Sequence, residues 1–362
     1  MISHRKLTCI LIFMFALSFP ISLAKATGLQ IRQFENNSNI QKYVISGKTM
    51  GTYYHVAVHT HKKILAENLK QKIEVQLKIT NQQMSLYLPS SEISKFNSVE
   101  KNKPINISKN FYRVIIQAQK LHKLTKGAWD GTIRPLYDLW NFDKTGLKAS
   151  SIPDQSKIET CLDNIGFKNI IIKEKNLKKK ISPLTLDLGS IAKGYGVDAV
   201  AKLLKGAGFK NFFVEIGGEI YVSGERSLTK KWRVGIADPS PGFHSGSYKI
   251  LELSDMALAT SGTYRNFFEY KGKTYSHIIN PETGWPVNNN IVSASVLADN
   301  CMMADGLATG LMVMGKKKAI ALVNTLDNVE CMIIIKKPDN QLEEFFSNGF
   351  TQHLIGKQSI VY

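Results

Sequence analysis

The chain has 362 residues, of which 43% are hydrophobic and 21% are charged. That balance is typical of a globular protein, and the length suffices for one large domain or two closely packed ones. Lysine and arginine outnumber the acidic residues, so the formal net charge is +18. A charge of this size suits either a solubilising surface or attraction to an anionic substrate or a membrane surface, and the export signal described next argues against nucleic acid.

The first 26 residues have the pattern of a secretory signal. Basic residues at 4–6 precede an apolar run at 7–23, and Ala24-Lys25-Ala26 matches a small-residue cleavage site. Pro20 interrupts the run and no stop-transfer pattern follows, which favours a cleaved signal over a retained membrane anchor. The three cysteines in the rest of the chain include no C-x-x-C pair, which argues against thiol redox chemistry. We expect a periplasmic protein, with association with the inner membrane as an open alternative.

Beyond the signal, the sequence divides into a polar leader (27–41), a folded domain (42–345) and a C-terminal extension (346–362). Helical periodicity predicts helices over residues 65–84, 109–126, 190–206 and 300–314, and a short one within 150–166. Alternating or apolar runs predict strands within residues 42–59, 169–172, 181–188, 211–216, 220–222, 232–237, 249–253, 257–260, 274–279 and 291–297. The frequent hairpins argue against a doubly wound parallel sheet and predict an α+β fold with mixed or antiparallel sheets and packed helices. The densest basic run, residues 173–180, is expected at the solvent-exposed tip of a hairpin.

The most informative segment runs from residue 186 to residue 198 and reads LDLGSIAKGYGVD. It predicts the end of a strand, a turn at Gly189 and a helix with Ser190 as its N-cap, which places Lys193 in the first helical turn. Free N–H groups, the helix dipole and a lysine together favour an anion, above all a phosphate. Asp187, on the incoming strand, does not fit a simple anion pocket. A carboxylate there implies a bridging metal, or a sugar, base or ring N–H to bind.

Two residues of the predicted helix at 300–314 have the spacing of a partial metal site. Asp305 and Thr309 are four residues apart and therefore share one face of the helix. With a nearby backbone carbonyl, their oxygens suit Mg²⁺, which keeps waters and takes further ligands from phosphates. Zinc would require His and Cys at ligand spacing, and none is present. The alternative is an aspartate that stabilises the start of the helix, with Thr309 in the core.

His277 stands near the end of a predicted strand, beside a turn at 280–284 that contains proline and glycine. Catalytic groups are often found where a strand meets a loop. A single histidine also fits a structural, hydrogen-bonded role, and spacing alone leaves both interpretations open.

Taken in order, these and further stretches resemble the ApbE family, the FAD:protein FMN transferases. The resemblance runs from about residue 50 to residue 315 and covers most of the chain that follows the signal. Its motifs are Met50-Gly51-Thr52, residues 91–97, Gly127-Ala128-Trp129-Asp130, Pro135-Leu136, Leu139-Trp140, residues 187–198, Gly217-Gly218, and residues 259–262, 277–284 and 304–309. So many separate motifs in one order make the resemblance specific.

The resemblance implies an α+β catalytic domain related to the T-fold. Members of the family bind FAD with Mg²⁺ and transfer the FMN part to a Thr or Ser hydroxyl of a target protein, forming a phosphoester and releasing AMP. Their targets include subunits of the Na⁺-translocating NADH:quinone reductase and of the Rnf complex that face the exported side. Two alternatives remain open: an FAD pyrophosphatase that yields FMN and AMP, and a non-catalytic periplasmic flavin-binding protein. The pairing of Asp305 with Thr309 argues against the second, because flavin binding alone needs no metal.

Position by position, the resemblance implies roles for twelve residues. Those expected to contact FAD are Met50, Tyr87, Ala128, Trp129, Asp130, Asp187, Lys193 and Ile279. The backbone carbonyl of Ser190, with Asp305 and Thr309, is expected to hold Mg²⁺. Lys193 would supply a second cation during transfer, His277 is the candidate general base, and Asp187 either takes part in catalysis or holds the flavin or adenine edge. The chain departs from many relatives at two of these positions, with Ser190 in place of Gly or Ala and Trp129 in place of Phe.

Overall fold

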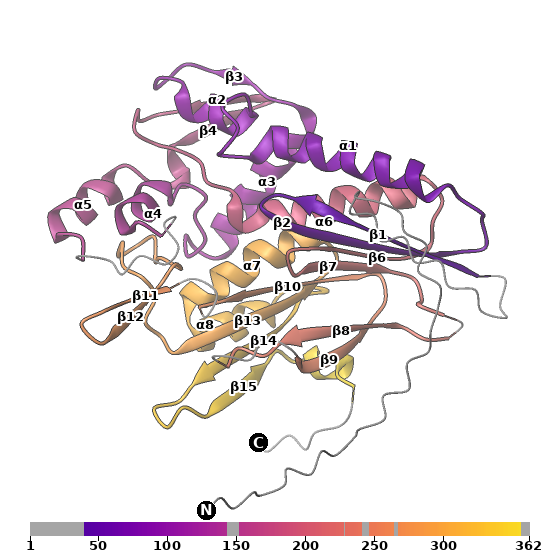
Figure 1. Cartoon of the computed structure of the whole chain (residues 1–362). Helices are drawn as coiled ribbons and strands as arrows, with labels where there is room; N and C mark the ends of the chain where they lie inside the picture. The colour runs from indigo at the N-terminus through magenta and orange to yellow at the C-terminus, as the bar shows by residue number, and fades with distance from the viewer. Residues whose placement is uncertain (1–39, 143–151, 228, 241–245, 264–266, 356–362) are drawn as a thin grey trace, which may run out of the picture.

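The structure, a computed structural model, describes residues 40–142, 152–227, 229–240, 246–263 and 267–355 (Figure 1). The expected signal at 1–26, most of the leader at 27–41 and the end of the C-terminal extension lie outside these ranges. Within them, no helix combines the length and the hydropathy that a membrane span requires.

The described residues form a large sheet of eight strands in the order β1-β2-β6-β7-β10-β13-β14-β15. Every pair of neighbours in this sheet is antiparallel. The strands are β1 (Gln41–Thr49), β2 (Thr52–Thr60), β6 (Asn211–Ile216), β7 (Glu219–Ser223), β10 (Met256–Gly262), β13 (Ile291–Ala298), β14 (Glu330–Lys336) and β15 (Leu342–Phe346). The predicted α+β class with antiparallel sheets is confirmed.

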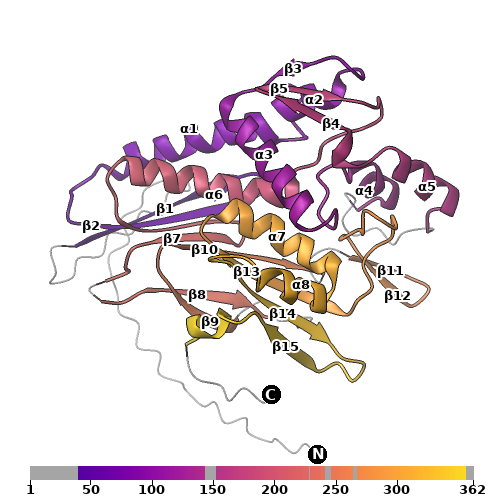
Figure 2. The ribbon, with the colours of Figure 1, turned by 180° about the vertical axis from the view of Figure 1, so that it is seen from behind.

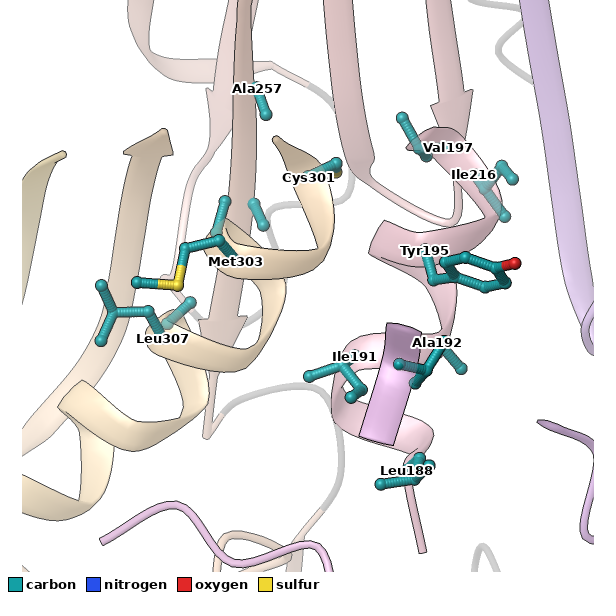
Figure 3. Close-up of a cluster of buried hydrophobic side chains, with 14 of the residues drawn as sticks. Leu188, Ile191, Ala192, Tyr195, Val197, Ile216, Ala257, Cys301, Met303 and Leu307 are labelled. Atoms are coloured by element: carbon teal, nitrogen blue, oxygen red, sulfur yellow. The ribbon is translucent and has the colours of Figure 1, made fainter. Parts of the chain in front are cut away.

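Helices cover one face of this sheet (Figures 1 and 2). The inner layer is α6 (Gly189–Gly206), which packs on β6 and β7, and α7 (Cys301–Met314), which packs on β10 and β13. Over them lie α1 (Ala66–Met84), against α6, and α3 (Lys109–Leu124), against α7. Tyr195 of α6 and Leu307 of α7 belong to the same buried apolar cluster (Figure 3). Removal of this apolar surface from water is the main force that joins the helices to the sheet.

Gly194 sets the distance between α6 and α7. A Cβ atom at this position would lie 2.4 Å from the carbonyl oxygen of Cys301, so a larger residue would push the two helices apart. The close approach lets the N–H of Gly194 donate to Oδ2 of Asp305 at 2.9 Å. The glycine therefore helps to place the aspartate that sequence analysis assigned to a metal.

A hairpin covers the opposite face of the sheet and extends the fold past its expected end. It consists of β8 (Trp232–Ala237) and β9 (Ser247–Leu253), and it packs with the short helix η2 (Phe350–His353) on a second apolar cluster. Phe350 is fully buried, and the N–H of Ile355 donates to the carbonyl of Ile250 at 2.9 Å. The boundary expected at residue 345 is therefore wrong, because apolar residues beyond it complete the core, and the fold continues to at least residue 355.

Smaller units flank the large sheet at the end where α6 begins. One packs α4 (Arg134–Trp140) and α5 (Gln155–Asp163) with the hairpin of β11 (Phe267–Tyr270) and β12 (Lys273–Ser276) around an apolar cluster, in which Trp140 of α4 stacks on Tyr275 of β12. The other is a three-stranded sheet of β3 (Ile105–Asn106), β5 (Asn176–Lys179) and β4 (Ile170–Lys173). The remaining elements are α2 (Glu92–Ser98), η1 (Phe167–Asn169) and α8 (Lys316–Val323).

The strand predicted at 181–188 is wrong, because a side chain takes the place of a neighbouring strand there. The amide of Asn97 donates to the carbonyl of Leu186 at 2.9 Å and accepts its N–H at 2.7 Å. Leu184, Leu186 and Leu188 are nevertheless buried at alternate positions, which explains the strand-like pattern.

The basic run at 173–180 begins, as expected, at an exposed hairpin turn, because Lys173 pairs with Asn176 across the turn between β4 and β5 and residues 173–175 are exposed. The rest of the run was not expected: it continues through β5, where Lys179 is 1% exposed and its Nζ donates to the carbonyls of Asn97 and Leu184 at 2.9 and 3.0 Å.

Candidate functional site

One pocket of about 730 Å³ opens where the start of α6 meets α7 and the ends of several strands. Its wall combines the turn between β1 and β2, the segment after α1, the loop before α4, the first residues of α6, the end of β10, the segment after β12 and the middle of α7. All twelve residues to which sequence analysis gave a role line this pocket: Met50, Tyr87, Ala128, Trp129, Asp130, Asp187, Ser190, Lys193, His277, Ile279, Asp305 and Thr309. The fold thus brings together residues that are up to 259 positions apart in the sequence.

Helix α6 begins one residue earlier than expected, and the side chain that accepts its first N–H is that of Asp187 and not that of Ser190. Leu188 is its N-cap, and Oδ1 of Asp187 accepts the N–H of Gly189 at 2.8 Å. An aspartate commonly accepts the N–H two residues ahead of it in this way. The prediction of Ser190 as N-cap is therefore wrong, and Lys193 lies at the start of the second turn. The hydroxyl of Ser190 instead accepts the indole N–H of Trp129 at 2.9 Å, which ties the loop before α4 to α6.

The oxygen donors expected to hold Mg²⁺ meet between α6 and α7. Asp305 is 3% exposed, and its Oδ2 accepts the N–H of Gly194. In a regular α-helix the N–H of Gly194 donates to the carbonyl of Ser190, so the Asp305 carboxylate and this carbonyl compete for the same N–H. Thr309 lies one turn along α7, with its Oγ1 3.0 Å from Oγ of Ser261. A carboxylate, a hydroxyl and a backbone carbonyl are hard oxygen donors, and this set fits Mg²⁺.

Lys193 reaches the same place from α6. Its Nζ lies 3.8 Å from Oδ1 of Asp305 and 3.5 Å from Oε1 of Glu219, the first residue of β7. Glu219 is 2% exposed, whereas 28% of the Lys193 side chain is exposed, so the ammonium connects buried carboxylates to the open pocket. A Cβ atom at Gly217 would lie 3.2 Å from Cδ of Lys193, so the glycine leaves room for the lysine stem.

Asp130 lines the pocket, but its carboxylate holds the loop together. Oδ1 accepts the N–H and the hydroxyl of Thr132 at 2.8 and 2.6 Å, and Oδ2 accepts the N–H of Phe167 at 3.1 Å. Oδ2 also lies 3.3 Å from Nδ1 of His122, and this contact raises the pKa of His122 against the opposing effect of burial. These contacts tie the loop that carries Ala128 and Trp129 to Phe167 and His122, so the shape of this wall depends on the Asp130 carboxylate.

The remaining predicted residues lie around the opening. His277 follows β12, which ends at Ser276, three residues before the predicted end of that strand. It is half-buried, and the adjacent Ile278 and Ile279 are each 5% exposed and anchor the segment in the core. Tyr87 also lines the pocket and is 82% exposed, a high fraction for a tyrosine. The histidine therefore stands on a firmly held segment at the edge of an open pocket.

Comparisons with known proteins agree with this geometry. The sequence model of the ApbE family matches residues 50–333. The chain belongs to the ApbE family. It is 40% identical to the FAD:protein FMN transferase of Vibrio cholerae, over 86% of this chain and 92% of that protein, and 38% identical to that of Haemophilus influenzae, over 84% and 90%. The solved structure of the flavin transferase ApbE from Vibrio cholerae superimposes with a TM-score of 0.79 at 38% identity, covering 87% of this chain and all of that one. The apo form of the Pseudomonas stutzeri flavinyl transferase ApbE gives 0.78 at 28% identity.

Two charged residues that line the pocket were not predicted from the sequence as site residues. Glu219, to which no role was assigned, contacts Lys193, and Arg134 lies 3.6 Å from Asp187. Glu219 directly follows Gly217-Gly218, and a carboxylate next to a double-glycine turn is the feature of the sequence that could have pointed to it as a site residue. Arg134 gave no signal, because its partner lies 53 positions further along the chain.

Asp198, in the middle of α6, holds the start of α7 in this ApbE-family fold. Its Oδ1 accepts the N–H of Cys301 at 2.8 Å, and its Oδ2 accepts that of Met302 at 2.9 Å. These bonds satisfy N–H groups that have no partner within α7. The pKa of Asp198 is raised from the usual 3.8 to about 6, chiefly by burial and to a smaller extent by the nearby charge of Asp305, against the opposing effect of the two N–H groups.

The raised pKa of Asp198 predicts a pH-dependent stability. Because the pKa is higher in the folded than in the unfolded chain, the stabilisation from its protonation is full below about pH 4 and is lost as the pH rises through about 6. Asp198→Asn removes this titration. The free energy of unfolding of the wild type minus that of the variant should therefore fall by about 2 kcal/mol between about pH 4 and about pH 7. Urea unfolding of both proteins across this range measures it, and a difference that does not change with pH would contradict the assignment.

Proposed function

We propose that this enzyme transfers the FMN part of FAD to a Thr or Ser hydroxyl of a target protein, forming a phosphoester and releasing AMP, in a reaction that depends on Mg²⁺. The observation that carries the proposal is the gathering of Lys193, His277, Asp305 and Thr309 in one pocket at the start of α6. The chain's 40% identity to an FAD:protein FMN transferase, over most of both chains, supports the same activity.

The pocket offers a separate environment to each part of FAD. The start of α6 and the ammonium of Lys193 favour the pyrophosphate, because a helix N-terminus and a cation both attract anions. Met50, Tyr87, Trp129 and Ile279 offer apolar and aromatic surface to the flat ring systems. Asp305, Thr309 and the carbonyl of Ser190 would hold Mg²⁺, which when bound neutralises charge on the pyrophosphate.

The chemical step is an in-line displacement at phosphorus. The oxygen of the acceptor hydroxyl forms a bond to the FMN-side phosphorus, the bond from that phosphorus to the bridging oxygen breaks, and AMP leaves with that oxygen. His277, as neutral imidazole, takes the proton of the hydroxyl. Lys193 offsets the negative charge that builds up on the phosphate oxygens. Most of the acceleration in such a transfer comes from positioning and charge neutralisation, which a fixed pocket provides.

The acceptors that we propose are exported-side subunits of membrane redox complexes, of the Na⁺-translocating NADH:quinone reductase or Rnf type. The place of the reaction would then be the periplasm, in solution or at the inner membrane. The secretory pattern of the first 26 residues supports this location.

Incubation of the purified protein with FAD, Mg²⁺ and candidate acceptor subunits tests the function. We expect flavin fluorescence on the acceptor band in a denaturing gel, a mass increase of one FMN unit on a Thr- or Ser-containing peptide, and release of AMP. An acceptor whose target hydroxyl is removed should stay unlabelled. Free FMN without a labelled protein would identify a pyrophosphatase instead, and FAD that stays intact would identify a binding protein.

Lys193→Ala should lower the rate of transfer on the order of a hundredfold or more, because the cation aimed at the developing charge is lost. The measurement is the initial rate of AMP release at saturating FAD and Mg²⁺. Lys202→Ala is the matched control, since Lys202 lies on the same helix with an exposed side chain outside the pocket lining. A Lys193→Ala rate close to that of the control would remove the lysine from the chemical step.

A further inference from the structure

Arg134 is a charged residue of the pocket wall to which the family resemblance assigns no role. It is the first residue of α4 and lines the pocket together with Asp187. A cation at the start of a helix faces the positive end of the helix dipole, and α4 has no acidic residue in its first turn to offset it. The helix dipole therefore disfavours Arg134 at this position, and contacts outside the first turn must stabilise it there.

Two carboxylates supply those contacts, one on each side of the guanidinium. Nη2 lies 2.7 Å from Oδ1 of Asp138, one turn along α4, and Nη1 lies 3.6 Å from Oδ2 of Asp187. The Asp138 side chain is 55% exposed, whereas those of Arg134 and Asp187 are 22% and 18% exposed. The guanidinium therefore extends from the surface toward the pocket, with the ring of Tyr137 5.8 Å away.

This arrangement holds the Asp187 carboxylate from two directions. Oδ1 accepts the N–H of Gly189 at the start of α6, and Oδ2 faces Arg134. The guanidinium carries a full positive charge and the helix start a partial one, and both offset the repulsion that a carboxylate would exert on a pyrophosphate bound at the same helix start. A carboxylate oxygen has more than one lone pair, so Asp187 keeps acceptor capacity for N–H or O–H donors in the pocket.

We propose that Arg134 is a positioning residue for FAD. It orients Asp187 as an acceptor for a neutral donor group of FAD, an N–H of a ring edge or a sugar hydroxyl, and it offsets the charge of Asp187 beside the pyrophosphate. This inference rests on the proposed function, because it takes FAD as the ligand of the pocket. It also explains why a carboxylate stands in a pocket that otherwise suits an anion. Since Arg134 acts through Asp187, its contribution disappears when Asp187 is replaced.

A double-mutant cycle on FAD affinity tests the proposal. Arg134→Gln, Asp187→Asn and the double variant are titrated with FAD in buffer that contains Mg²⁺, and binding is followed by the change in flavin fluorescence. Arg134→Gln weakens FAD binding on the order of tenfold, as expected for loss of the partly buried ion-pair partner that orients the Asp187 carboxylate. The double variant binds FAD within about twofold of Asp187→Asn alone, because the two residues act as one unit. Arg233→Gln, the same substitution in the exposed ion pair of Arg233 with Glu252 on the β8–β9 hairpin, leaves the affinity unchanged.

Two results would overturn the proposal. If the losses from Arg134→Gln and Asp187→Asn multiply in the double variant, Arg134 acts on FAD independently of Asp187. If Arg134→Gln binds FAD as the wild type does, it has no part in binding. A wild-type protein that binds no FAD would contradict the proposed function itself, so the two failures are distinguishable. Should Arg134→Gln lower the melting temperature, Arg134→Lys replaces it in the same cycle, because lysine keeps the charge but lacks the planar fork, and a smaller loss that again depends on Asp187 is expected.

Discussion

Asp305→Ala is expected to abolish Mg²⁺-dependent transfer. The substitution removes a carboxylate that is 3% exposed and lies at the meeting point of α6 and α7, beside the ammonium of Lys193. Without it, only neutral oxygens of the proposed Mg²⁺ site remain, and these bind a divalent cation weakly. The measurement is the rate of AMP release and acceptor labelling as a function of Mg²⁺ concentration. Full activity of this variant at low Mg²⁺ would contradict the metal assignment.

Because Asp305 also accepts the N–H of Gly194, a second variant separates metal binding from folding. Asp305→Asn keeps an oxygen acceptor for that N–H but loses the negative charge. We expect its melting temperature to stay near that of the wild type while its Mg²⁺ requirement rises steeply. Asp327→Ala, at an exposed position between α8 and β14, is the matched control and should keep the wild-type dependence on Mg²⁺.

His277→Ala is expected to reduce transfer by about a hundredfold to ten-thousandfold while FAD binding survives, because general-base catalysis typically contributes that much. The histidine stands on a segment held by the buried Ile278 and Ile279, so its loss should leave the pocket intact. Single-turnover labelling of the acceptor gives the rate, and a flavin fluorescence titration gives the affinity. His61→Ala, at an exposed position before α1, is the control.

The pH dependence of transfer distinguishes a base from a binding group. The wild-type rate should fall on the acid side as an imidazole becomes protonated, and His277→Ala should lose this dependence along with most of its rate. Near wild-type activity would show that another group takes the proton. A parallel loss of FAD affinity would assign His277 to binding instead.

Strands and helix starts that depend on residues close together in the sequence were predicted correctly from local patterns. The alternating residues of β6 and β8 gave both strands their observed bounds, and the predicted helix start at Asn300 is an N-cap whose side chain accepts the N–H of Met303. The segment at 181–188 failed because the partner of its backbone is the side chain of Asn97, which lies 89 residues earlier. An alternating apolar pattern indicates which residues are buried, but not what pairs with the backbone.

The sequence by itself determined the family, the α+β class and twelve of the residues that line the pocket, because ordered motifs and residue types can be recognised without coordinates. Only the tertiary structure decided what each side chain contacts. It gave the capping bond of α6 to Asp187 rather than Ser190, turned the Asp130 carboxylate into the support of a loop, and set Lys193 between Asp305 and Glu219. It also placed Arg134 against Asp187. The physical reason is that the energy of a half-buried or buried charge depends on partners within a few ångströms. For Lys193 and Arg134 these partners come from distant parts of the chain, and only the packed fold brings them together.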